Sequence, residues 1–177
     1  MNQIYRRLKK MREKYIDTLA KLYDYATAVY SKKTYTQWYD TKEGSYTYAT
    51  FKNECDALSK VLTQYGIGAG DKVAILSTNM PNWSVAFFSL VPFGRIAIPI
   101  LPDSSPNEIT NILEHSESKV IFVSQKLASK ITQECRDKMT LVIDIDTFEV
   151  IQADDQKFTC DGRTSIPTPD DIATIIY

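Results

Sequence analysis

Two spacings of apolar residues alternate along most of this chain. Short apolar runs of strand length are separated by segments in which apolar residues recur every three or four positions, the spacing of one helix face. Such continuous runs, separated by helices, are typical of parallel strands that are buried on both faces. The pattern predicts an α/β fold, a parallel sheet covered by helices, with strands at Lys72–Ser77, Ile96–Ile100, Val120–Val123 and Leu141–Ile145.

The helices between these runs have recognisable ends. Ser105, Pro106 and Glu108 form a capping box, and Gly66 stands where a helix C-cap belongs. Asn79 is expected to cap the next helix, with Pro81 in its first turn. The inner faces of the expected helices are Phe51, Cys55, Leu58, Val61, Leu62 and Tyr65, then Trp83, Phe87, Phe88, Leu90 and Val91, then Ile109, Ile112 and Leu113, then Leu127, Ile131 and Cys135.

The two ends of the chain are organised differently from this centre. Residues 1–33 are expected to form an N-terminal helical segment, and residues 34–177 one α/β subdomain. Thr34–Tyr39 and Ser45–Tyr48 predict two short strands of a hairpin. Phe148–Pro169 is polar and is expected to be a loop-rich connection, followed by a last apolar strand at Ile172–Ile176.

The net charge of the chain and the distribution of its basic residues limit the kinds of partner that the protein can bind. The net charge of −1 argues against a protein that binds nucleic acid. Residues 1–14 nevertheless carry six basic residues and Glu13, a local charge of +5. This stretch fits either a docked helix with a solvated basic side or a peripheral contact of residues 1–15 with an anionic membrane.

The cysteine pattern and hydropathy point to the cytoplasm. The three cysteines (Cys55, Cys135 and Cys160) are far apart and form no Cys-x-x-Cys pair, so neither a disulfide framework nor a zinc site is expected. No apolar run approaches the roughly 18–20 residues of a membrane-spanning helix. A cytoplasmic location is the expectation.

Three local motifs, each taken without its context, could indicate a phosphate-binding or catalytic site. The glycines of Gly66–Gly70 follow an expected helix and precede a strand, the reverse of a phosphate-binding turn, so a helix end is the better interpretation. Asp144, Asp146 and Thr147 match the Asp-x-Asp-x-Thr motif of haloacid-dehalogenase-like phosphatases, although only 30 residues remain for that family's later motifs. His115, the only histidine, lies in the last turn of an expected helix, where the helix dipole favours it, and no triad signature surrounds it.

The order of turns and helices from Ser45 to Asp103 resembles the AMP-forming acyl-CoA synthetases, the adenylate-forming or AMP-binding superfamily, and within it the long-chain fatty-acid–CoA ligases. The segments that carry the resemblance are Tyr46–Phe51, Gly70–Ile75, Asn79–Trp83, Phe93–Ile100, Ser105–Glu108 and Val120–Val123. It extends over about Thr34–Tyr177 and implies the N-terminal subdomain of the large domain. Arg95 departs from the pattern, because small residues are usual after that glycine.

The resemblance implies a reaction for the full-length enzyme. A fatty acid attacks ATP in the presence of Mg²⁺ to give an acyl-adenylate, and coenzyme A then displaces AMP. The segment Asp170–Tyr177 looks like the strand that precedes the family's phosphate loop, so the chain is interpreted as a piece that stops before the chemistry. No residue is assigned a catalytic, cofactor-binding or metal-binding role, no cofactor is expected on the isolated chain, and the chain alone is expected to be inactive.

A second hypothesis is a stand-alone α/β binding or interaction module without catalysis. The strand at the chain's end favours the first hypothesis, because such a strand normally continues into a covering helix. A piece of an enzyme would also expose apolar surface, through which a dimer could form.

Overall fold

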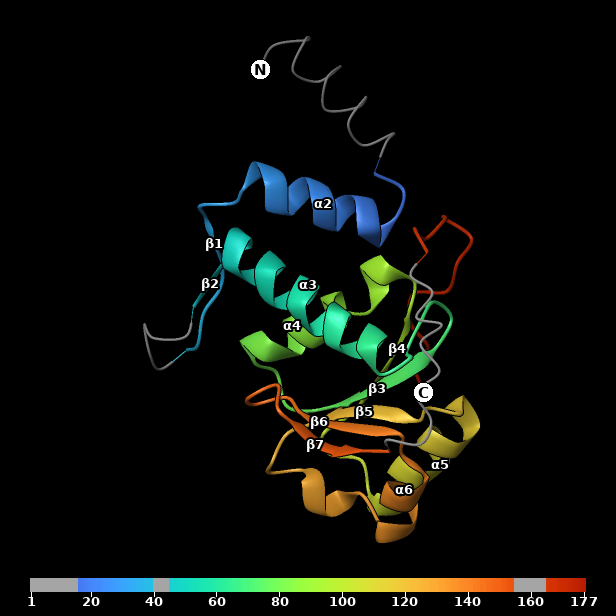
Figure 1. The fold of residues 1–177 in the computed structure, drawn as a ribbon. Helices are drawn as coiled ribbons and strands as arrows, with labels where there is room; N and C mark the ends of the chain where they lie inside the picture. Colours follow the sequence, from blue (N-terminus) through green and yellow to red (C-terminus); the bar gives the residue numbers. More distant parts are fainter. Residues whose placement is uncertain (1–15, 40–44, 155–164) are drawn as a thin grey trace.

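A five-stranded sheet with helices on both faces forms the centre of the protein (Figure 1). The computed structural model describes residues 16–39, 45–154 and 165–177. The strand order is β4-β3-β5-β6-β7, in which the first four strands are parallel and β7 runs antiparallel to β6. Their bounds are β3 Lys72–Leu76, β4 Ile96–Ile100, β5 Val120–Val123, β6 Leu141–Asp144 and β7 Val150–Ala153. The four strands predicted as apolar runs are confirmed.

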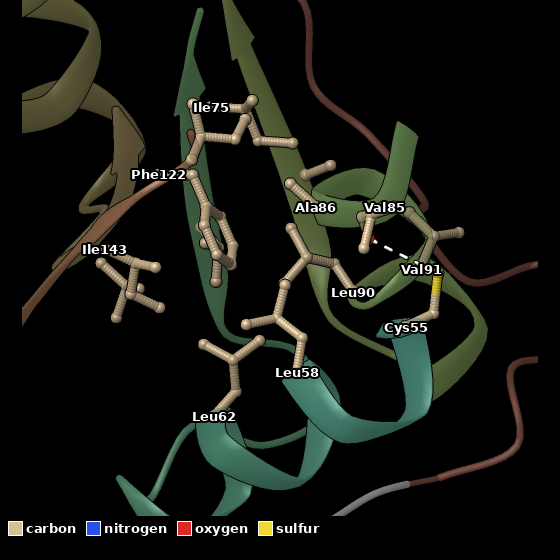
Figure 2. Close-up of a cluster of buried hydrophobic side chains, with 14 of the residues drawn as sticks. Cys55, Leu58, Leu62, Ile75, Val85, Ala86, Leu90, Val91, Phe122 and Ile143 are labelled. Atoms are coloured by element: carbon tan, nitrogen blue, oxygen red, sulfur yellow. Dashed lines mark hydrogen bonds between the residues drawn. The ribbon is translucent and has the colours of Figure 1, made fainter. Parts of the chain in front are cut away.

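Alternate side chains of the strands fill two separate hydrophobic cores. Ile75, Phe122 and Ile143 point to the face that is covered by helices α3 (Tyr48–Gln64) and α4 (Pro81–Phe88), as Figure 2 shows. The neighbouring strand residues point to the opposite face, against α5 (Pro106–Ser116) and α6 (Gln133–Lys138). Because both faces are covered, the strands read as continuous apolar runs rather than as alternating ones.

The ends of α3 and α5 follow the prediction, whereas the start of α4 does not. Ser105 and Glu108 form the expected capping box at α5, and Gly66, with φ of 73°, directly follows Tyr65, the C-cap of α3. Helix α3 begins with a capping box of Thr47 and Thr50, which the sequence analysis did not predict. The expectation that Asn79 caps α4 is wrong, because Pro81 is the first helical residue and Met80 occupies the N-cap without a side-chain hydrogen bond. A short 3-10 helix, η1 (Val91–Phe93), follows α4.

The stripe Leu127, Ile131 and Cys135 does not belong to one helix. A 3-10 turn, η2 (Ala128–Lys130), ends before Ile131, whose backbone is extended, and α6 starts anew with Thr132 as its N-cap. Ile131 and Cys135 are both buried in the same core. The spacing of these apolar residues is that of one helix face, although the backbone forms two separate helical segments.

The C-terminal third corrects two further expectations. The stretch Phe148–Pro169 contains a strand, β7, whose Val150 and Ile151 are exposed, so its sequence lacked the apolar run of the inner strands. The expected strand at Ile172–Ile176 is reduced to one bridge. Its Thr174 pairs with Ala97 of β4, and the Ala97 N–H donates to the Ala173 carbonyl at 3.0 Å.

The N-terminal layer consists of helix α2 (Leu19–Val29) and a small antiparallel pair, β1 (Thr34–Thr36) and β2 (Tyr46–Thr47). The hairpin is confirmed with shorter strands, whereas the helix expected over residues 1–15 lies outside the described residues. Tyr23 fixes α2 on α3 and α4: its hydroxyl donates to Asp56 of α3 at 2.9 Å, and its ring stacks on Phe88 of α4 with centroids 6.0 Å apart. Burial raises the pKa of the Tyr23 hydroxyl.

Arg95, the residue directly before β4, is completely buried on the α3 side of the sheet. Its guanidinium donates to the Ile67 carbonyl at 2.8 and 3.1 Å, to the Ser59 hydroxyl at 2.8 Å and to the Thr63 hydroxyl at 2.8 Å. Further donations reach the carbonyls of Ser59 and Ser89. Burial lowers the pKa of Arg95 to about 10, so the group remains charged at neutral pH.

Two glycines with the same backbone conformation provide a matched test of packing at the turns before β3 and β4. Gly70 and Gly94 have φ of 84° and 81°, where a side chain is strained. A Cβ at Gly70 would meet nothing within 4 Å, whereas at Gly94 it would lie 2.9 Å from the Ser165 hydroxyl oxygen and 3.1 Å from the Ala69 Cβ.

We expect Gly70→Ala to lower the free energy of unfolding by about 1 kcal/mol, the cost of the left-handed backbone. Gly94→Ala should cost about 1–2 kcal/mol more, because overpacking adds to the same strain. Urea denaturation followed by circular dichroism measures both. Equal losses in the two variants would show that the close approach at Gly94 has no energetic consequence.

We expect Arg95→Met to lower the free energy of unfolding by about 3 kcal/mol or more, because several buried acceptors lose a charged donor at the same time. Arg136→Met is the control: Arg136 is half-buried and donates to the single carbonyl of Ala128. Its loss should cost less than about 1 kcal/mol. A similar loss in both variants, measured by urea denaturation, would contradict the role given to Arg95.

Candidate functional site

The topology of the sheet places a switch point, where the chain's connections diverge, at the carboxyl ends of β3 and β5. From β3 the chain passes through α4 to β4 on one side, and from β4 it passes through α5 to β5 on the other side of β3. The two connecting helices cover opposite faces of the sheet. In open α/β sheets ligands bind where neighbouring connections diverge in this way. We therefore take the carboxyl edge of β3, β5 and β6 as the candidate site.

Two serines end the central strands at this edge. Ser77 follows β3 and donates its hydroxyl to the Thr78 carbonyl at 3.0 Å. Ser124 follows β5, and its backbone N–H donates to the Leu76 carbonyl at 3.1 Å. The Ser124 hydroxyl is buried and has no hydrogen-bond partner within the described residues. A buried polar atom without a partner is uncommon, so this hydroxyl marks an open hydrogen-bonding position at the edge.

The paired aspartates lie at the end of β6, as the sequence predicts, but they stabilise a turn. Asp144 accepts from the Gln125 side chain at 2.7 Å and from the Asp146 N–H at 2.8 Å. Asp146 accepts from the Gln125 N–H at 3.0 Å. Three carboxylate oxygens thus bind protein donors, and the described residues contain no group of three or more side chains that could hold a metal ion. The geometry favours the turn interpretation over phosphatase chemistry.

Asn82 closes the edge between β6 and α4. It is 7% exposed, and its amide donates to the carbonyls of Ile145 at 2.8 Å and Asp146 at 3.0 Å. Its oxygen accepts from the Tyr46 hydroxyl at 2.9 Å, which connects the hairpin to the same point. The sequence analysis took Asn82 only as part of a turn, since no local signal reveals partners 63 residues away.

A hollow of about 360 Å³ lies beside this edge, between β1 and the start of α4. Aromatic and apolar side chains form much of its lining, which consists of Tyr35, Thr36, Asn79, Met80, Trp83 and Ser84. The edge thus combines an open hydroxyl with a nearby apolar hollow. It can hold a ligand by hydrogen bonds and apolar contact, and its described side chains include no paired nucleophile and base.

The other two motifs lie away from this edge. The Gly68 N–H donates to the Asp71 carboxylate at 2.6 Å. This backbone N–H is therefore not free to bind a phosphate. This confirms the helix-end interpretation of Gly66–Gly70. His115 is exposed, and its Nδ1 lies 2.8 Å from the Tyr177 hydroxyl, with no carboxylate–nucleophile arrangement around it among the described residues.

In the part of the chain that the structure describes, no helix has the length and apolar content needed to cross a membrane. Four residues at the edge, Ser77, Asn82, Gln125 and Ser124, were not singled out from the sequence. Their roles depend on strand register and on contacts between distant segments.

Known proteins share both the sequence pattern and the fold. The chain is 28% identical over 92 residues to 4-hydroxybutyrate--CoA ligase 2 of Metallosphaera sedula, a match of 52% of this chain and 17% of the relative. It is 24% identical to long chain acyl-CoA synthetase 2 of Arabidopsis thaliana over 68% of this chain and 19% of that protein. The chain thus spans about a fifth of the length of these relatives.

A solved structure and a family description agree with these relatives. The N-terminal subdomain of Klebsiella oxytoca NpsA superimposes with a TM-score of 0.67 at 20% identity, over 89% of this chain and 37% of that one. This likeness shows that the chain has the fold of that N-terminal subdomain. The family described as "AMP-binding enzyme" matches residues 23–177. The chain therefore belongs to the AMP-binding enzyme family.

Proposed function

We propose that this chain is the N-terminal part of an ATP-dependent acyl-CoA ligase that activates a long-chain fatty acid. The carboxylate of the acid would attack the α-phosphate of ATP with Mg²⁺ bound, giving an acyl-adenylate and pyrophosphate. Coenzyme A would then form the thioester and release AMP. The observation that carries this proposal is the family match over residues 23–177, together with relatives that are named as CoA ligases.

The long-chain part of the proposal has narrower support. One relative is named as a long chain acyl-CoA synthetase, while another is named for the short acid 4-hydroxybutyrate. The hollow beside the carboxyl edge is lined by Tyr35, Met80 and Trp83, which suits an apolar chain better than a charged one. The choice between acids therefore requires a direct comparison.

We further propose that the isolated chain is inactive and binds no ATP, Mg²⁺ or coenzyme A. Adenylate formation requires donors for the polyphosphate, a cation at the reacting groups and an acid for the ribose. The carboxyl edge offers serine hydroxyls and aspartates that already accept hydrogen bonds from Gln125. Its exposed apolar residues beside β4, Leu101, Ile172 and Ile176, would contact further protein or a second copy of the chain.

We expect the purified 177-residue chain to show no fatty-acid-dependent exchange of pyrophosphate into ATP and no acyl-CoA. The protein translated from the complete reading frame should convert palmitate to its thioester faster than octanoate, acetate or 4-coumarate. Mass spectrometry of the acyl-adenylate and a thiol assay for coenzyme A measure both steps.

The outcomes separate the parts of the proposal. Adenylate formation by the 177-residue chain would contradict its inactivity. A preference of the complete protein for acetate or 4-coumarate would agree with the ligase reaction but contradict the long-chain fatty acid as its substrate. Failure with every acid tested would contradict the ligase function and favour a binding module.

A further inference from the structure

One lysine joins the chain segments that follow two neighbouring strands of the sheet. Lys130 is the last residue of η2, in the segment that follows β5. Its ammonium donates to the Pro102 carbonyl at 2.6 Å and to the Ser104 carbonyl at 3.0 Å. Both carbonyls belong to the loop Leu101–Ser104, which follows β4 and which we call the β4 loop. Lys130 therefore connects the segments that leave the carboxyl ends of β4 and β5.

This connection lies beside the candidate site. In the sheet β3 stands between β4 and β5, so the joined segments leave the two strands that flank β3. The carboxyl end of β3 is the point from which the connections diverge, and ligands of open α/β sheets bind at such a point. A side chain that holds the neighbouring β4 loop can thus set the shape of the site.

The β4 loop has few other fixed contacts. The Ser104 N–H donates to the Leu101 carbonyl at 3.1 Å, a hydrogen bond within the loop itself. Among the described residues, Lys130 is the only residue outside the loop that forms hydrogen bonds with it. The Leu101 side chain is 70% exposed, so burial does little to hold it. The position of the loop therefore depends on Lys130.

Ion pairing and the helix dipole do not explain a lysine at this position. In the described part of the chain Lys130 forms no salt bridge. Ser104 stands two residues before Pro106, the start of α5, and a cation is disfavoured near a helix N-terminus. Hydrogen bonding to Ser105 lowers the pKa of Glu108, and the charge of Lys130 adds a smaller contribution to this shift. The hydrogen bonds of Lys130 all go to the β4 loop.

We propose that Lys130 is a positioning residue of the acyl-CoA ligase reaction, which it supports by holding the β4 loop beside the end of β3. This inference rests on the proposed function. Two of the three ammonium donors are bound to the loop, so Lys130 acts through the loop rather than on the substrate. Hydrogen bonds from a charged donor hold a loop more firmly than neutral ones. Catalysis depends on such precision, because a displacement of about 1 Å can lower a rate about a hundredfold.

Amide hydrogen exchange of the 177-residue chain tests the hold on the loop. Lys130→Met keeps most of the apolar stem and removes the donors. We expect peptides that cover Leu101–Ser104 to exchange about tenfold faster in this variant, because the loop loses both charged hydrogen bonds. Lys126→Met, which removes an exposed lysine four residues earlier, should leave their exchange unchanged.

Kinetics of the complete protein test the role in the reaction. We expect Lys130→Met to lower kcat/KM about tenfold or more for at least one of the fatty acid, ATP and coenzyme A. Lys130→Arg should restore most of this loss, because a guanidinium can also donate to two carbonyls. Lys126→Met should stay within about twofold of the unaltered protein, since no hydrogen bond of the β4 loop changes. Pyrophosphate exchange and a thiol assay measure the two steps, and circular dichroism confirms that each variant folds.

Several results would overturn the inference. Unchanged exchange in Lys130→Met would show that the lysine does not hold the loop. Faster exchange with unchanged kcat/KM for all three substrates would leave Lys130 a structural role alone. Equal losses in the Lys126 and Lys130 variants would indicate a general effect of charge. These results contradict the inference and leave the ligase function intact, whereas inactivity of the unaltered complete protein would contradict both.

Discussion

The buried Arg95 guanidinium is the interaction on which the packing around the first two central strands depends. It joins four parts of the chain: the start of β4, the last turns of α3 through Ser59 and Thr63, the turn at Ile67, and the end of α4 at Ser89. A buried charge is costly unless hydrogen bonds replace its water. Here the hydrogen bonds go to hydroxyl and carbonyl oxygens, and none goes to a carboxylate. These acceptors must therefore be placed accurately for the arginine to stay buried. Arg95 therefore fixes where α3 ends relative to β4.

The fold was predictable from the sequence wherever the signal was local. Continuous apolar runs predicted four parallel strands, and the Ser105–Glu108 box predicted the start of α5, because burial on two faces and capping are properties of short segments. Strand β7 was missed because an edge strand needs only one covered side. The break at Ile131 was missed because Leu127 before it and Cys135 after it pack against the same core at helical spacing. Arg95 was identified as a departure, but its partners lie 6 to 36 residues away, and the sequence shows none of them.

The candidate site was less predictable for the same reason. The sequence indicated Asp144 and Asp146, since aspartates after a strand are visible in a motif. It did not indicate that Gln125 would donate hydrogen bonds to both carboxylates. Nor did it indicate that Asn82 would connect α4, the end of β6 and the hairpin. These bonds are made across strands and depend on register. The Ser124 hydroxyl, buried without a described partner, becomes visible only when β3 and β5 are placed side by side.

The two edges of the sheet differ, and the difference bears on the proposed ligase. At one edge β7 runs antiparallel to β6 and pairs with it from Leu141 to Ile143, with one shift of register after Val142. At the other, β4 has a single bridge at Ala97, and the side chains of Ile172 and Ile176 next to it are 59% and 78% exposed. Apolar side chains beside an incompletely paired strand are the features of a surface that further chain can cover. The incompletely paired strand β4 is the direct neighbour of β3 in the sheet. Protein that packed against the outer side of β4 would therefore lie one strand away from β3, the strand at which the connections of the sheet diverge.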